Sequence, residues 1–313
     1  MDILITVGTV FASRYTAEYF CRKGNNVYVL NRGNNIQSPG VIHIKKDRHY
    51  LGDTLRQYHF DAVLDITAYN CDDVRLLFEA LGTFGNYFFI SSSAVYPETL
   101  KQPFNEQQSC GANSYWGDYG INKLAAEKYV SENIPNAYII RPPYLYGPMN
   151  NLYREAFVFE CAENERPFYI PKDGKMPLQF FHIRDMCRFI EVLIDRQPSD
   201  MIYNVGNLEI VDINKWVELC YEVLNKKPTF KFIDNSVPQR SYFPFLDYAY
   251  ILDVTKQNNL MIDTIPLFDG LCESYEWYKN HRELIRRKPL IDYINKRLCE
   301  KISVNSKTVI KTS

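Results

Sequence analysis

The first half of the chain alternates short apolar runs with segments in which apolar residues recur at helical spacing. The apolar runs predict six buried strands, at residues 3–7, 27–30, 41–44, 62–66, 87–90 and 137–140. The helical spacing predicts helices at residues 12–23, 71–82 and 117–133. Apolar strands joined by helices are typical of a parallel sheet that is covered on both faces. The pattern therefore predicts an α/β fold with a doubly wound parallel sheet, in which ligands bind beyond the carboxyl ends of the strands.

The pattern becomes less regular after Pro148. Helices are predicted near 151–164, 185–196, 212–225 and 268–287, and short strands near 168–170, 201–205 and 229–233. This combination indicates a smaller, mixed α/β region. The length of 313 residues is enough for about two domains.

Composition and charge exclude several classes of protein. Hydrophobic residues make up 46% of the chain, which is enough for a sizeable core. The 36 Lys and Arg against 37 Asp and Glu leave no overall charge that would attract nucleic acid or an anionic membrane. No apolar stretch approaches the roughly 18 residues of a membrane span, and the first residues do not form a secretory signal. We therefore expect a cytoplasmic protein with no membrane partner.

The cysteines, histidines and C-terminal basic residues each allow a limited conclusion. The eight cysteines form no C-x-x-C pair, so reduced thiols are expected, and the five histidines form no helical ligand pair, so no metal site is predicted. Beyond residue 278, ten Lys or Arg stand against three acidic residues. Without a nucleic-acid-binding motif, this pattern favours a solvated surface with a frayed terminus over a nucleic-acid partner.

The turn after the first predicted strand is where a dinucleotide pyrophosphate would meet the amides of a helix N-terminus. The dinucleotide fingerprint places glycines at three-residue intervals, but positions 7, 10 and 13 hold Val, Val and Ser, and only Gly8 remains. Because β-branched residues disfavour positive φ, we expect the loop to have ordinary conformations or to lie further from the phosphates. Arg14 is a candidate source of compensating charge.

The second predicted strand ends in Asn31-Arg32. An acidic residue at this position accepts a hydrogen bond from the adenosine ribose of NAD and repels the 2′-phosphate of NADP. Asn31 does not repel that phosphate and Arg32 attracts it, so the sequence slightly favours NADP. A polar loop without a binding role is an alternative of comparable weight.

The strongest catalytic pattern lies between the fifth predicted strand and the helix at 117–133. Three serines, at positions 91–93, follow the strand, and Tyr119 and Lys123 share one face of the helix at a spacing of four residues. A nearby ammonium lowers the pKa of a tyrosine from about 10. Such a tyrosine can move a proton to or from a carbinol oxygen while hydride moves to or from a nicotinamide. A serine hydroxyl beside it would hold the same oxygen.

On these residues the chain resembles an extended short-chain dehydrogenase/reductase of the NAD-dependent epimerase/dehydratase type. The similarity extends from Ile3 to about Trp277, and its carriers are Asp47 and the segments 6–11, 91–96, 119–123, 141–148, 182–185 and 203–207. The resemblance implies NAD or NADP as cofactor and a nucleotide sugar as substrate. It also implies a homodimer formed through the helices at 71–82 and 117–133.

The resemblance further implies a domain organisation. A Rossmann domain is expected at 1–148, with added segments near 180–206. A mainly substrate-binding domain is expected at 149–290, and a basic tail at 291–313.

The same resemblance implies roles for individual residues. Tyr119 would be the catalytic acid/base, Lys123 would bind the nicotinamide ribose, and Ser92 would bind the reacting oxygen, with Ser91 and Ser93 as alternatives in register. The other residues expected at the cofactor are Gly8, Thr9, Val10, Phe11, Asn31, Arg32, Asp47 at the adenine, Thr67, Ala68, and Pro143 beside the nicotinamide. Those expected at the substrate are Ser93, Tyr144, and Arg240 at the phosphates.

Departures from the family pattern narrow the expected reaction. Ser93-Ala94 stands where 4,6-dehydratases carry an acid pair, and Tyr144 stands where many members have a substrate-binding Asn. Elimination of water needs a further acid and base near C5 and C6, so we expect an epimerase or a ketoreductase, which the sequence does not separate. The missing glycines leave a second class open: a catalytically weak or inactive Rossmann-fold binding or sensor protein that could associate with RNA.

Overall fold

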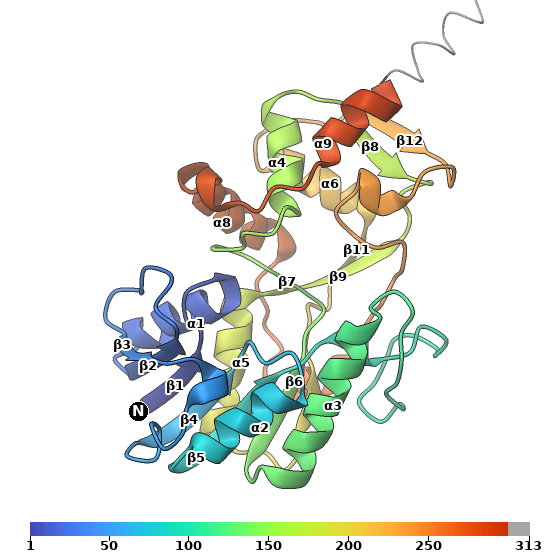
Figure 1. Ribbon diagram of the computed structural model, residues 1–313. Coiled ribbons are helices and arrows are strands. Elements are labelled where there is room, and N and C mark those ends of the chain that lie inside the picture. Colours follow the sequence, from blue (N-terminus) through green and yellow to red (C-terminus); the bar gives the residue numbers. More distant parts are fainter. Residues whose placement is uncertain (300–313) are drawn as a thin grey trace, which may run out of the picture. The chain divides into compact units, whose positions relative to one another are not determined.

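The computed structural model describes residues 1–299 and divides into two compact units (Figure 1). The first unit consists of residues 1–150, 179–210 and 250–277. The second unit consists of residues 151–178, 211–249 and the described residues from 278 onwards. Each unit is therefore built from three separate segments of the chain.

A seven-stranded parallel sheet forms the centre of the first unit, with the order β10-β6-β5-β4-β1-β2-β3. The strands are β1 (Asp2–Thr6), β2 (Asn26–Asn31), β3 (Ile42–Lys45), β4 (His59–Asp65), β5 (Thr83–Ile90), β6 (Ala137–Arg141) and β10 (Ile202–Asn204). The predicted doubly wound sheet is thereby confirmed. The winding reverses between β1 and β4, so the carboxyl ends of these two strands mark the expected ligand site.

Helices cover both faces of this sheet. They are α1 (Phe11–Arg22) and α5 (Ile183–Arg196) on one face, and α2 (Cys71–Ala80) and α3 (Asp118–Asn133) on the other. Ile3 of β1 belongs to the core that contains Phe20 of α1, whereas the adjacent Leu4 belongs to the core that contains Leu77 of α2. Successive strand residues enter opposite cores because their side chains point to opposite faces. The helices expected at 71–82 and 117–133 thus lie on the same face.

Several elements of the later chain were not predicted. They are β7 (Tyr144–Tyr146), β9 (Pro177–His182), β11 (Ile210–Asp212) and α7 (Thr255–Leu260). β7 pairs in parallel with β9. It starts directly after Pro142-Pro143, the two prolines that predict the end of the preceding strand. The helix predicted at 268–287 is α8 (Leu267–Asn280), and it stops earlier because His281 leaves the helical conformation with φ of −142°.

The second unit is a smaller mixed α/β structure, as the sequence pattern indicated. Its elements are α4 (Glu155–Glu163), β8 (Phe168–Pro171), α6 (Ile213–Glu222), β12 (Phe230–Ile233), α9 (Leu290–Tyr293) and the π-helical η5 (Ile294–Cys299). β8 and β12 form a two-stranded parallel sheet. Aromatic rings dominate the interior, where Trp216 lies 4.9 Å from Phe245 between ring centroids.

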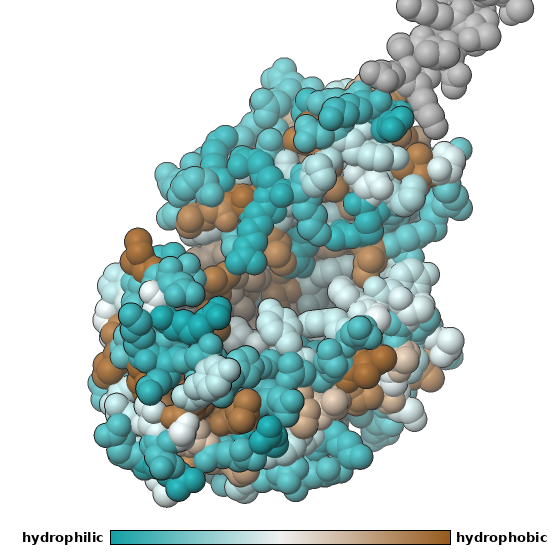
Figure 2. Space-filling view, in the orientation of Figure 1, coloured by the Kyte–Doolittle hydropathy of each residue, from teal (hydrophilic) through white to brown (hydrophobic). Residues whose placement is uncertain are grey.

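The surface mixes hydrophilic and hydrophobic residues (Figure 2). On the face shown in Figure 2, hydrophobic residues occur in small groups among hydrophilic ones. No helix within residues 1–299 is long and apolar enough to cross a membrane. Of the basic residues beyond 278, Arg282 and Arg287 form ion pairs with Glu163 and Glu160 of α4. Lys301, Lys307 and Lys311 lie outside the described residues.

Candidate active site

The loop after β1 contains positive φ angles, although valine occupies two of the positions where the fingerprint has glycine. Val7 has φ of 67° and Gly8 has φ of 66°. A Cβ on Gly8 would lie 2.5 Å from Val29 Cγ1, so glycine is required there. The expectation that the loop would adopt only ordinary conformations is therefore wrong. The loop accepts a left-handed conformation at a β-branched residue, which normally costs free energy.

Asn31 explains how this conformation is held. Its Nδ2 donates to the Val7 carbonyl at 2.7 Å, and the Val7 N–H donates to the Leu30 carbonyl at 2.9 Å. The Asn31 Oδ1 accepts from the Gly33 N–H at 2.8 Å and lies 2.9 Å from His43 Nε2. The side chain expected at the adenosine ribose is thus engaged in fixing the loop.

The start of α1 has the features of an anion site. Its N-cap residue, Val10, makes no side-chain capping bond, so first-turn amides are available to a ligand. Ser13, at the third glycine position, is buried, and its Oγ donates to the Val10 carbonyl at 2.9 Å. The Arg14 guanidinium donates to Glu18 one turn along the same helix, so part of its charge is neutralised there. Thr9 accepts a hydrogen bond from Asn35 at 3.3 Å.

The region after β3 contains Asp47, the residue expected at the adenine. Asp47 caps the 3-10 helix η1 (Arg48–Tyr50), and the His49 N–H donates to its carboxylate at 3.0 Å. The amide and side chain of His49 hold the pKa of Asp47 below its usual value. The exposed Arg32 guanidinium lies 4.0 Å from the Asp47 carboxylate. No acidic residue stands at the end of β2, as the sequence already indicated.

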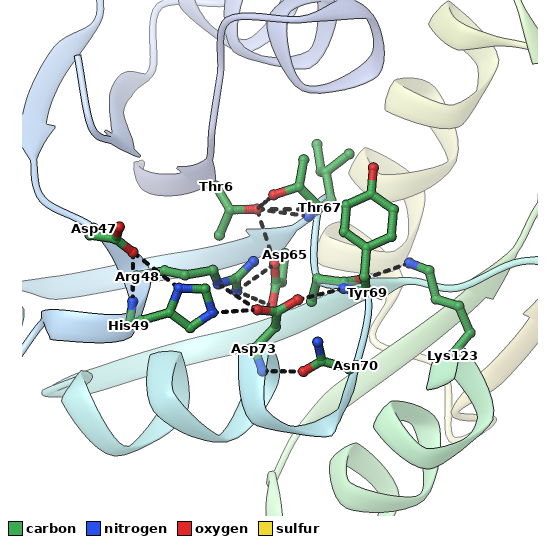
Figure 3. A network of polar contacts seen from close by, with 12 residues as sticks. Thr6, Asp47, Arg48, His49, Asp65, Thr67, Tyr69, Asn70, Asp73 and Lys123 are labelled. Carbon is green, nitrogen blue, oxygen red and sulfur yellow. Dashed lines mark hydrogen bonds and ion pairs between the residues drawn. The ribbon is translucent and has the colours of Figure 1, made fainter. Parts of the chain in front are cut away.

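A network of polar contacts lies at the ends of β1 and β4 (Figure 3). Thr67 N and Oγ1 both bind Thr6 Oγ1, at 3.3 and 3.1 Å. The Ala68 carbonyl accepts a 2.7 Å hydrogen bond from Lys123 Nζ. The loop expected along the cofactor, with Thr67 and Ala68, is therefore bonded both to β1 and to the helix that carries Tyr119.

The structure brings Ser92 and Tyr119 together. A hydrogen bond from Ser92 lowers the pKa of Tyr119, but burial of the phenol has the larger effect and raises it overall. Ser91 Oγ is buried and has no hydrogen-bond partner within residues 1–299, and Ser93 belongs to the 3-10 helix η2 (Ser93–Val95). The geometry thus favours Ser92 among the three serines.

Lys123 differs from the sequence-based expectation. Its buried ammonium donates to the carbonyls of Ala68 and Ile90, each at 2.7 Å, and lies over the rings of Phe89 and Tyr69. Burial lowers the pKa of Lys123 to about 8. The expectation that this ammonium lowers the Tyr119 pKa is not met in the protein alone, because burial dominates at the phenol and carbonyl groups hold the ammonium.

Aromatic residues continue from Tyr119 toward the end of β6. Trp116 lies 6.0 Å from Tyr119 and 5.7 Å from Tyr250 between ring centroids, and Tyr250 lies 5.0 Å from Tyr144. Pro143 is buried directly before Tyr144. Tyr144 therefore joins an aromatic cluster that reaches the candidate acid/base, and sequence analysis did not identify its other members.

Arg240 lies in the second unit, in the 3-10 helix η3 (Gln239–Ser241). Burial lowers the pKa of Lys288, and the charges of Arg240 and Arg154 lower it further. Arg240 and Arg154 therefore both lie close enough to Lys288 for their charges to act on it. The sequence pointed to Arg240 alone, since Arg154 and Lys288 are far from it along the chain.

The comparison with known families is decisive for classification. Residues 3–206 match the NAD dependent epimerase/dehydratase family. The chain belongs to this family. The match covers most of the first unit, including the loop after β1, the three serines and Tyr119 with Lys123.

Two relatives of similar identity to this chain have names of different kinds. The chain is 26% identical over 303 residues to the chloroplast stem-loop binding protein of 41 kDa b from Arabidopsis thaliana, covering 87% of this chain and 78% of the relative. It is 25% identical over 215 residues to probable GDP-L-fucose synthase 1 from Oryza sativa subsp. japonica, covering 63% of each chain.

Solved structures share the fold at lower identity. A UDP-glucose 4-epimerase from Thermotoga maritima, solved with UDP-glucose, has a TM-score of 0.72 at 18% identity and covers 90% of this chain and 99% of its own. A dTDP-glucose 4,6-dehydratase from Bacillus anthracis, solved with NAD, has a TM-score of 0.73 at 18% identity and covers 93% and 99%.

Proposed function

We propose that the protein is an NAD(P)-dependent epimerase or ketoreductase that acts on a carbinol of a nucleotide sugar. The observation that carries the proposal is the contact between Ser92 and Tyr119 at the carboxyl end of β5, with the buried Lys123 one turn further along α3. These three residue types at one strand end are suited to moving a proton at a carbinol oxygen.

The residues of the first unit fit a dinucleotide. Gly8 has no room for a side chain, and the first turn of α1 has no side-chain cap, so the backbone can approach a pyrophosphate there. Lys123 uses two N–H groups on the carbonyls of Ala68 and Ile90, and an ammonium has a third N–H that can reach a ribose hydroxyl. A nicotinamide dinucleotide, when bound, supplies a hydride acceptor and donor.

The chain's own residues account for the proton transfer. Tyr119 takes the proton of the substrate hydroxyl as it is oxidised and returns it when the carbonyl is reduced. Ser92 hydrogen-bonds the same oxygen and keeps it in reach of the phenol. Because burial raises the pKa of Tyr119, a phenolate there needs a nearby positive charge, and we propose that Lys123, four residues along α3, supplies it once cofactor and substrate are bound.

The cation cluster of the second unit supports a substrate with phosphates. Arg154, Arg240 and Lys288 belong to different segments of the chain, and such clusters suit a diphosphate. Several relatives are named as enzymes of nucleotide sugars, including the rice GDP-L-fucose synthase and the Thermotoga epimerase. Ser93-Ala94 in place of an acid pair favours epimerisation or ketone reduction over dehydration.

Replacing Tyr119 by Phe tests this proposal. We expect turnover of UDP-, GDP- or dTDP-hexoses, assayed with both NAD⁺ and NADP⁺, to fall by about 10²-fold or more, since acid–base catalysis contributes 10²–10⁴-fold. Tyr69→Phe is the matched control, because it removes a phenol whose ring lies only 6.3 Å from that of Tyr119. Near-normal turnover by Tyr119→Phe would contradict the proposal.

One observation favours a second candidate function. The relative matched over 303 residues is named as a stem-loop binding protein, and the cluster of Arg154, Arg240 and Lys288 suits RNA phosphates as well as a diphosphate. In that case the protein would bind an RNA hairpin and show no turnover. A gel-shift titration at two salt concentrations, with and without a competing nucleoside diphosphate, separates the two functions.

The family resemblance also suggests a homodimer. α2 and α3 pack side by side on one face of the sheet, where a second copy could complete a four-helix interface. Sedimentation velocity at micromolar concentration tests this, and a species of 36.8 kDa alone would contradict it.

A further inference from the structure

The carboxylate of Asp65 lies at the carboxyl end of β4 and is fully buried (Figure 3). It accepts hydrogen bonds from Thr6 Oγ1 at 3.0 Å, from Tyr87 Oη at 2.9 Å, and from Arg48 at 2.9 and 3.1 Å. Burying a charge is costly unless it is paired and hydrogen-bonded. The proton transfer at Tyr119 makes no direct use of this carboxylate, so its presence calls for another explanation.

We infer that Asp65 is a positioning residue for the Tyr119–Lys123 pair: it fixes the loop that binds the Lys123 ammonium, and its charge balances that ammonium. The role of the pair itself rests on the proposed function. The contacts of Asp65 and of Lys123 do not depend on it.

Thr6 connects Asp65 to the loop. Its hydroxyl donates to Asp65 and accepts from the backbone N–H groups of the next two residues, Ile66 and Thr67, at 3.1 and 3.3 Å. The carbonyl that follows, at Ala68, accepts the Lys123 hydrogen bond. The carboxylate, the strand ends and the loop are therefore bonded together, and a shift at Asp65 would move the carbonyl that holds the ammonium.

A second carboxylate fixes the other end of the loop. Asp73 accepts the Tyr69 N–H at 2.8 Å and lies 3.0 Å from His49 Nε2. The Tyr69 ring lies over Lys123 Nζ, 5.6 Å from the ring centroid. Asp73 thus sets the residue that covers the ammonium, whereas Asp65 sets the carbonyl that binds it.

Charged residues from four elements act on Lys123. Asp65 on β4, Asp73 on α2 and Glu127 on α3 favour the protonated form, whereas Arg48 on η1 disfavours it. Asp65 has the largest effect among these charges, and burial lowers the pKa of Lys123 to about 8 in spite of it. Removing the carboxylate would therefore lower this pKa further, so that less ammonium remains at neutral pH.

An NMR titration of protein labelled with ¹³C at the lysine ε-carbons tests the inference directly, and Lys123→Met identifies the signal. We expect Lys123 to titrate near pH 8 in the wild type. In Asp65→Asn we expect the midpoint to fall by about one unit or more, since a nearby opposite charge changes a pKa by roughly 1–3 units. Tyr87→Phe is the matched control, because it removes a hydrogen bond to the same carboxylate and no charge.

A double variant covers the case in which Asp65→Asn does not fold because Arg48 is left unpaired. Asp65→Asn with Arg48→Gln removes both charges, and the midpoint should still fall, since Asp65 outweighs Arg48 at Lys123. An unchanged midpoint in the folded variant, or an equal shift in Tyr87→Phe, would overturn the inference.

The pH dependence of turnover then separates this inference from the proposed function. If both hold, the alkaline limit of turnover moves down together with the Lys123 midpoint in the Asp65 variant. If the midpoint moves but the wild type turns over no nucleotide sugar, the proposed function fails while the positioning of Lys123 stands.

Discussion

The loop after β1 and the group of Ser92, Tyr119 and Lys123 differ in what they keep of the family pattern. In the loop, valine occupies positions 7 and 10, where the family pattern has glycine, yet Val7 has a positive φ. In the candidate catalytic group, the residue types of the family resemblance are present, yet the Tyr119 pKa is raised and backbone carbonyls hold the Lys123 ammonium. Backbone shape is preserved in one region and side-chain identity in the other.

The loop after β1 and the candidate catalytic group therefore depend on different kinds of contact. The loop needs only the right backbone conformation. Asn31 can hold this conformation through its hydrogen bond to the Val7 carbonyl, although Asn31 lies outside the glycine motif. The catalytic group needs a proton balance, which depends on buried charges such as Asp65 and Arg48 that no short motif contains. Substitutions in each region can test this separation.

The largest effect is expected from Gly8→Ala. At φ of 66°, with Val29 Cγ1 only 2.5 Å from the added Cβ, both the backbone and the packing oppose the methyl group. We expect the free energy of unfolding to fall by about 2–4 kcal/mol, together with a loss of NAD(P)H binding measured by fluorescence.

Gly24→Ala is the control for the backbone part of this effect. Gly24 has φ of 81°, but no atom lies within 4 Å of a Cβ built on it, so the loss should be about 1–2 kcal/mol. Equal losses in the two variants would mean that close packing against Val29 has no part in the requirement for glycine at position 8.

The next effect concerns the cost of burying Lys123. Since folding lowers its pKa from 10.5 to about 8, the unfolded chain binds more protons between these values, and stability rises with pH there. Relative to Lys123→Met, the free energy of unfolding of the wild type should therefore rise by up to about 3 kcal/mol between pH 8 and pH 10.5. Urea denaturation across this range measures the difference.

Lys128→Met is the control, because Lys128 lies on the same helix and is exposed. Its difference from the wild type should stay flat over the same pH range. A flat difference for Lys123→Met as well would show that the ammonium is not destabilised by burial.

The sequence was sufficient to predict a strand or a helix where a single hydrophobic periodicity extends through the whole segment. Strands such as β1 and β5 and helices such as α1 and α2 follow from apolar spacing, since burial selects the apolar positions. β7 was missed because it is short and follows Pro142-Pro143, and its pairing with β9 brings together residues far apart in the chain. Local patterns contain no information on such pairing.

The residues of the candidate site could be proposed from the sequence, but the buried charges that surround them could not. Tyr119 and Lys123 were proposed from their spacing and Ser92 from the family resemblance, and in the structure Ser92 contacts Tyr119. Asp65 lies inside the strand predicted at 62–66, but it was not singled out because no short motif marks it. Its importance comes from Arg48, Thr6 and Tyr87, which reach it from other elements.

The smallest effect is expected from a substitution of Val7 in the loop after β1. Val7→Gly removes a β-branched residue from φ of 67°, where strain costs about 1–3 kcal/mol, but glycine returns roughly 0.5–1 kcal/mol of that through chain entropy. A net gain of about 1 kcal/mol is expected in thermal denaturation. Val10→Gly, at an ordinary φ of −136°, should instead lose about 0.5–1 kcal/mol. If both variants changed the stability in the same direction, Val7 would not be strained. The hydrogen bond from Asn31 would then not be what holds the loop in its conformation.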